Sequence, residues 1–199
     1  IRTAAGEVPL VTQDELTLLG VQGVDENTID LAIRLLTQTA DDGSEVDSIA
    51  KIDALLSEAL VALQMITNAA DNDTAATTIG HLHYAALGYD YLTPEFETSL
   101  AKVFDLSNIT SDEANSVAEI ETIIATYENL IAYVANSETA DHIPTESDYA
   151  QLGLMDVSAR TLVVLNDALT RDASLSNIVN DVNELQLLIN DFNSSMDTI

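Results

Sequence analysis

The stretch LTLLGVQGVD at residues 16–25 decides the fold, because it returns twice along the chain. Residues 84–93 read YAALGYDYLT, and residues 149–158 read YAQLGLMDVS. Each copy has a Leu-Gly pair, an apolar residue four positions after the glycine, and then Asp, Thr or Ser. The three glycines are 68 and then 65 residues apart. Self-similarity at a nearly fixed period is typical of repeat proteins, so three copies of one module are predicted.

Around each Leu-Gly pair the sequence predicts three helices and no strand of any weight. A short first helix ends at the glycine, the residue that best tolerates the left-handed conformation there. A second helix follows the Asp, Thr or Ser, which are good N-cap residues. After a polar loop comes the longest helix, whose apolar residues are spaced three and four apart. In the first copy these residues are Ile49, Ile52, Leu56, Ala59, Leu63 and Ile66.

The predicted fold is therefore all-α, an elongated tandem array of three antiparallel three-helix bundles. Residues 1–11 are predicted to be a linker, and the modules are predicted to span residues 12–72, 73–137 and 138–199. The joints between modules are polar, and the sequence leaves open whether they bend or continue a helix. Because the first residue is Ile and not Met, we expect the chain to be part of a longer protein.

The charge balance restricts the possible partners. The chain has 34 acidic and 6 basic residues, a net charge of −28, and the acidic excess is spread over all three copies. Phosphate binding needs clusters of Lys and Arg, so nucleic acid is excluded as a partner. Anionic membrane surfaces are disfavoured for the same reason, and no apolar run is long enough for membrane insertion. Self-repulsion of this size favours a saline setting, where ions screen it.

The Leu-Gly turn, the capped second helix and the long third helix resemble the GA type of three-helix module of bacterial surface proteins. They are still more similar to the acidic helical repeats of giant secreted RTX-type adhesins. Residues 24–33, 41–43 and 49–52 carry most of this resemblance. It implies a secreted or bacterial cell-surface location, and a stalk or adhesive module acting in adhesion and biofilm. The first partners would be neighbouring repeats of the same long chain.

GA modules are known for binding serum albumin, and this gives the alternative function. The chain would then be a GA-like ligand-binding module for a host or bacterial surface protein, with the second module as the binding unit. No binding residue is carried over from that family, because this surface is far more acidic. The candidate partner-binding residues are Tyr89 and Tyr91, since Tyr is favoured at interfaces. The alternative for these rings is packing beneath their own loop.

Candidate calcium ligands gather in one loop of the first copy: Asp41, Asp42, Glu45 and Asp47. Calcium takes several oxygen ligands from such loops. However, the EF-hand order is absent and the other copies lack the cluster, so a solvated turn that caps the third helix is the alternative. The two histidines of the His81-x-His83 pair diverge around a helix and cannot easily share an ion. The absence of cysteine excludes disulfides and thiolate metal sites.

Nothing in the sequence predicts catalysis. There is no Gly-rich phosphate loop and no Ser-His-Asp arrangement with a recognisable spacing. Carboxylates are so numerous that two neighbouring ones do not mark a catalytic pair. The chain is therefore predicted not to be an enzyme, and no cofactor other than calcium is considered.

Overall fold

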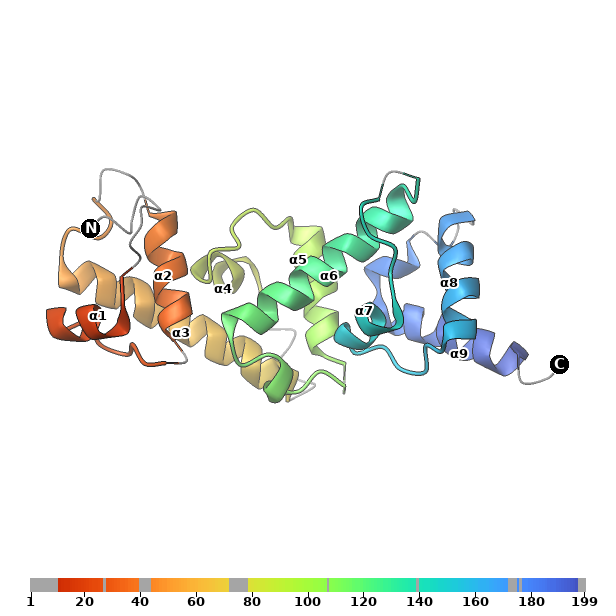
Figure 1. Ribbon diagram of the computed structural model, residues 1–199, viewed down its shortest axis with the longest axis horizontal. Coiled ribbons are helices and arrows are strands. Elements are labelled where there is room, and N and C mark those ends of the chain that lie inside the picture. Colours follow the sequence, from red (N-terminus) through yellow and green to blue (C-terminus); the bar gives the residue numbers. More distant parts are fainter. Residues whose placement is uncertain are drawn as a thin grey trace.

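The computed structural model describes residues 11–26, 28–39, 44–71, 79–106, 108–138, 140–171, 175 and 177–196. All regular structure in these ranges is helical, so the all-α prediction is confirmed (Figure 1). The first segment contains α1 (Gln13–Leu19), α2 (Ile29–Gln38) and α3 (Ile49–Ala70). The second contains α4 (His81–Ala86), α5 (Pro94–Phe104), the 3-10 turn η3 (Ser111–Glu113) and α6 (Val117–Ala135). The third contains α7 (Glu146–Gln151), α8 (Ala159–Arg171), η4 (Ile178–Asn180) and α9 (Val182–Met196).

Polar side chains start the helices near the predicted positions. Thr12 and Glu15 form the predicted capping box at α1, each accepting a hydrogen bond from the backbone amide of the other. Thr93 caps α5, and Ser158 accepts a hydrogen bond from an amide in the first turn of α8 at 3.2 Å. In the first segment the second helix begins later than expected, after Thr28. These caps satisfy amides that have no partner inside the helix.

The Leu-Gly pair ends the first helix in the same way in every segment. Its glycine has a φ of 90°, 83° and 75° in Gly20, Gly88 and Gly153 respectively. The amide after the glycine donates to the carbonyl five residues earlier, at 3.0, 2.9 and 3.0 Å, which is the Schellman pattern. The residues joined by this bond are buried in all three segments: Leu16 and Val21, Tyr84 and Tyr89, Tyr149 and Leu154. The repeated motif therefore stops a helix and places two side chains in the core.

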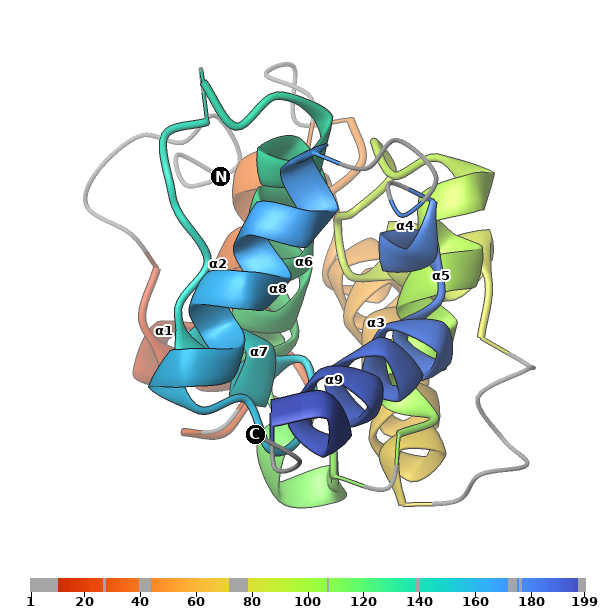
Figure 2. The same cartoon turned by 90° about the vertical axis from the view of Figure 1, so that its right-hand side faces the viewer.

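The long helices form two rows along the molecule (Figures 1 and 2). One row consists of α2, α6 and α8, and the other of α3, α5 and α9; neighbours within each row are in contact. The second helix of one segment thus lies beside the third helix of the next. Consecutive segments therefore exchange rows: the second helix lies in one row in the first and third segments and in the other row in the second segment. The short helices also contact the preceding segment, because α4 packs on α3 and α7 packs on α6.

One hydrophobic core runs through all three segments, from Leu16 to Ile189. Helix α4 packs chiefly on α3, a helix of the preceding segment. The finer prediction of three separate antiparallel bundles is therefore not confirmed, and the module boundaries stay a prediction. Residues 1–10 of the predicted linker lie outside the described residues, whereas Val11 packs against the core.

Candidate functional site

The junction between the first and second segments is built around Tyr89. This side chain is 1% exposed, and its hydroxyl donates to the carbonyl of Val117 at 3.3 Å. The guanidinium of Arg34, from α2, lies over the ring at 4.1 Å from its centre. The pKa of the Tyr89 phenol is raised above 10.0 by burial, and the nearby Arg34 charge offsets part of this rise. A cation above a buried ring is an attractive arrangement that adds to the area the ring buries.

The C-terminal end of α2 also binds the backbone of the Leu-Gly turn. Arg34 Nε donates to the carbonyl of Leu87 at 3.0 Å, and Gln38 Nε2 donates to the carbonyl of Gly88 at 3.1 Å. These carbonyls belong to the end of α4, where no further turn of helix can satisfy them. A β-carbon on Gly88 would lie 1.9 Å from Gln38 Oε1, so glycine permits this close approach as well as the positive φ.

The second junction repeats this geometry with different residues. Asn108 Nδ2, just after α5, donates to the carbonyl of Gly153 at 2.8 Å. A β-carbon on Gly153 would lie 2.9 Å from Ile109 and 3.2 Å from Leu106. Thr126 of α6 donates to the side chain of Gln151 at 2.9 Å. In both cases the Leu-Gly turn of one segment is held by the end of the second helix, or the loop after it, of the preceding segment.

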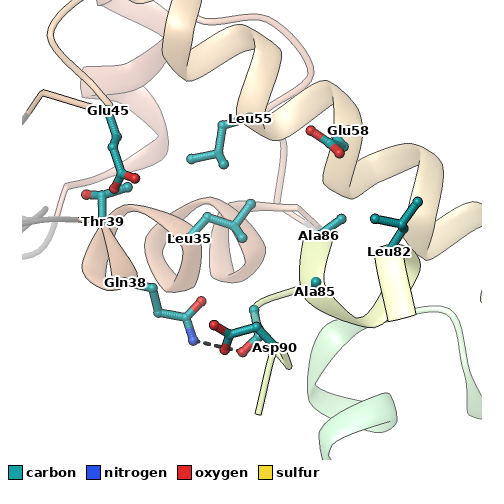
Figure 3. A pocket seen from close by; sticks show the side chains of 11 residues that line it. Leu35, Gln38, Thr39, Glu45, Leu55, Glu58, Leu82, Ala85, Ala86 and Asp90 are labelled. Atoms are coloured by element: carbon teal, nitrogen blue, oxygen red, sulfur yellow. Dashed lines mark hydrogen bonds between the residues drawn. The ribbon is translucent and has the colours of Figure 1, made fainter. Parts of the chain in front are cut away.

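A groove of about 560 Å³ opens beside the first junction (Figure 3). Its apolar lining comes from three helices and includes Leu35 of α2, Leu55 of α3 and Leu82 of α4. Leu82 is 78% exposed. Carboxylates from Glu45, Glu58 and Asp90 also line it. Such a groove suits an apolar side chain that has a positive charge next to it.

The two candidate tyrosines have different surroundings. Tyr89 lies in the core, in agreement with the interpretation that its ring packs beneath its own loop. Tyr91 is 60% exposed, and its ring meets the Tyr89 ring edge-on, with 6.4 Å between the ring centres. Only Tyr91 therefore presents a ring to a partner. The repeat contains the signal for this difference, because Tyr89 aligns with Val21 and Leu154, which are both apolar.

The candidate calcium ligands are only partly described. Asp41 and Asp42 lie outside the described residues. Asp47 forms an exposed ion pair with Lys51 at 3.0 Å, and Glu45 lines the groove. Within the described ranges, no group of three or more His, Asp or Glu side chains has an arrangement that could hold a metal ion. The calcium site therefore stays a prediction.

The second segment holds a polar group of side chains that the sequence did not predict. His81 Nδ1 lies 2.7 Å from Glu97 Oε1, and this carboxylate is nearly buried. The Tyr84 hydroxyl is buried and has no hydrogen-bond partner among the described residues. In the third segment, the equivalent Tyr149 donates to Asn166 at 2.7 Å. Burial, and after it the charge of Glu97, raises the pKa of Tyr84.

Comparison of the chain with protein-family models, with curated proteins and with solved structures gives no match. Among the described residues, no helix combines the length and the apolar character needed to cross a membrane.

Proposed function

We propose that the chain is a non-enzymatic repeat segment of a large secreted or cell-surface bacterial protein, where it acts as a stalk or adhesive module. The observation that carries this proposal is the repeated docking of the Leu-Gly turn on the preceding segment, through Gly88 and again through Gly153. A contact that is made in the same way twice suits an array in which every repeat binds its neighbour.

The shape and the charge of the chain support this role. The segments follow one another along the longest axis (Figure 1), so each added segment would lengthen the molecule. The net charge of −28 keeps neighbouring chains apart and the protein soluble, as an exposed stalk requires. The continuous core joins the segments into one body that transmits a pulling force from end to end.

Two measurements test the proposal. Small-angle scattering of the 199-residue chain should give an elongated particle, and a compact particle would contradict a stalk. Antibodies raised against the chain should label intact cells, or the matrix around them, in the organism that produces it. Labelling that appears only after the cells are opened would overturn the proposed location.

The alternative function is a GA-like ligand-binding module, and one observation favours it: exposed Tyr91 and exposed Leu82 both belong to the second segment. Titration with serum albumin, the ligand of GA modules, tests it directly. Binding should weaken in Tyr91→Ser and Leu82→Ser, while Val163→Ser, which removes an exposed apolar residue from the third segment, should have no effect. If albumin does not bind the wild-type chain, albumin is excluded as the ligand of a GA-like module in this chain.

A further inference from the structure

The Leu-Gly turn of the first segment has the same backbone as the other two, but its leucines are exposed. Leu19 is 50% exposed, whereas Leu87 and Leu152 at the equivalent positions are fully buried, with 0% exposed. Leu18, one residue before, is 88% exposed. A leucine position that is buried in the second and third segments and half-exposed in the first indicates a surface that is made to be covered.

The other two segments show what covers such a turn. Over Gly88 lies Gln38, the last residue of the second helix in the preceding segment; over Gly153 lies Leu106, at the equivalent position of the next repeat. The third helix of the preceding segment completes the surface, because α4 packs on α3 and α7 packs on α6. Around Gly20, in contrast, an added β-carbon would meet nothing within 4 Å.

The hydrogen bonding of the turn also differs between the segments. The carbonyls of Gly88 and Gly153 accept hydrogen bonds from Gln38 and Asn108 of the preceding segment. The carbonyl of Gly20 accepts one from Gln22 of its own turn, at 3.0 Å. Gln22 thus makes within the segment the bond that a preceding segment makes elsewhere.

We propose that the edge formed by Leu18, Leu19 and Gly20 is the docking surface for one further segment of the same type. This segment would cover the leucines with its third helix and bring a side-chain amide or guanidinium from the end of its second helix to the turn carbonyls. The inference rests on the proposed function and names the partner that such an array requires at this end.

A second copy of the present chain suits this edge less well than a preceding repeat does. The free end of its third segment carries Asp167 and Arg171 where the first segment has Arg34 and Gln38. These two residues pair with each other at 2.7 Å between Arg171 Nε and Asp167 Oδ1. Asp167, whose carboxylate has no donor, thus stands where Arg34 donates to a turn carbonyl, so the occupant is a segment with a donor at this position and an apolar third helix.

The experiment is a tandem duplication of residues 12–79 within the full chain, so that the first segment occurs twice in succession. The wild-type chain has no cysteine, and Leu19→Cys therefore introduces a single thiol, at a position that is buried in the second and third segments. The thiol is placed either in the upstream copy or in the downstream copy, and its rate of reaction with a soluble disulfide reagent is measured. We expect the downstream thiol to react at least about tenfold more slowly, because only that copy has a segment before it.

Equal reaction rates would overturn the docking inference. Scattering of the duplicated chain separates this failure from a failure of the proposed function: a longer particle with an accessible thiol retains the stalk and rejects this docking edge. If the thiol of the unduplicated chain becomes protected as the protein concentration rises, the occupant is a second copy and the proposal is also wrong.

A second variant gives the same decision without any labelling. Leu18→Ser combined with Leu19→Ser should lower the unfolding temperature of the duplicated chain when it is placed in the downstream copy, and should have little effect in the upstream copy. Equal effects in the two copies would contradict the inference.

Discussion

The guanidinium of Arg34 and the ring of Tyr89 lie 4.1 Å apart and join the first segment to the second. Arg34→Ala should lower the free energy of unfolding by about 2 kcal/mol, because it removes a cation–π contact and a hydrogen bond to a helix-terminal carbonyl. Arg34→Lys should retain part of this stability. Urea unfolding measures both variants.

The control for this prediction is Lys51→Ala, which breaks the exposed pair with Asp47 and should cost less than about 0.5 kcal/mol. If Arg34→Ala is as mild as Lys51→Ala, the junction does not depend on Arg34.

Tyr84 and Tyr149 provide a matched pair, because both rings are fully buried at equivalent positions but only Tyr149 has a hydrogen-bond partner among the described residues. Tyr149→Phe should destabilise the chain by about 1–2 kcal/mol, since it also leaves Asn166 without this donor. Tyr84→Phe should be neutral or should stabilise the chain by up to about 1 kcal/mol. Denaturant titrations of the two variants would contradict this prediction if they showed equal losses.

The three repeated glycines should differ in their response to substitution by alanine. Gly20→Ala should cost only the strain of a positive φ, about 1 kcal/mol. Gly153→Ala should cost about 1–3 kcal/mol more, because its new methyl group would meet Ile109 and Leu106. Gly88→Ala should cost about 1 kcal/mol more, because the flexible Gln38 side chain can turn away but loses its hydrogen bond to Gly88. Thermal unfolding of the three variants measures the order, and equal losses would show that these turns do not dock tightly.

These glycines also show how far the sequence predicts the fold. The Leu-Gly repeat, the caps and the spacing of three and four along the third helix are local patterns, and each local pattern has one low-energy backbone. Ile52 and Leu56 are accordingly buried as predicted. The apolar face of a helix, however, does not specify which helix covers it. The exchange of rows therefore could not be predicted, because packing within a segment and packing between segments need the same sequence pattern.

The candidate site illustrates the same limit. Arg34 is one of only 6 basic residues, and Lys102 occupies the equivalent position in the second copy, so the repeat contained a signal. Its target, however, is a ring and a carbonyl of another segment, and such a contact depends on the tertiary arrangement. The prediction that Tyr89 binds a partner rests on its residue type, although its alignment with Val21 and Leu154 indicates a core position.

High pH should unfold the chain through its buried tyrosines. Burial raises the pKa of Tyr127 to about 12 from 10.0, and raises those of Tyr84, Tyr89 and Tyr149 as well. The folded state thus favours the neutral phenols, and this contribution is complete below pH 10.0 and is lost as the pH rises toward 12. Tyrosinate absorbance should therefore rise together with the loss of helical circular dichroism. Ionisation of all 6 tyrosines near pH 10 with the helices intact would contradict this.

Calcium provides a test that separates a specific site from charge screening. Thermal unfolding is measured with calcium and with magnesium at matched concentration and ionic strength. If Asp41, Asp42, Glu45 and Asp47 bind calcium, only calcium should raise the unfolding temperature strongly, and Asp41→Asn with Asp42→Asn should abolish the difference. Equal shifts with both ions would instead mean that each ion only screens the net charge of −28.

Because consecutive segments exchange rows, the row in which a given helix lies depends on whether the number of preceding segments is odd or even. An odd number of intervening segments returns the second and third helices to the rows in which they started, as in the first and third segments, and an even number leaves them reversed. Inserting or deleting a single segment would therefore turn everything beyond it to the opposite side of the long axis, while a change of two segments would alter only the length. The direction in which a distal domain faces then depends on whether the number of segments is odd or even. Its distance from the other end of the array depends on how large that number is.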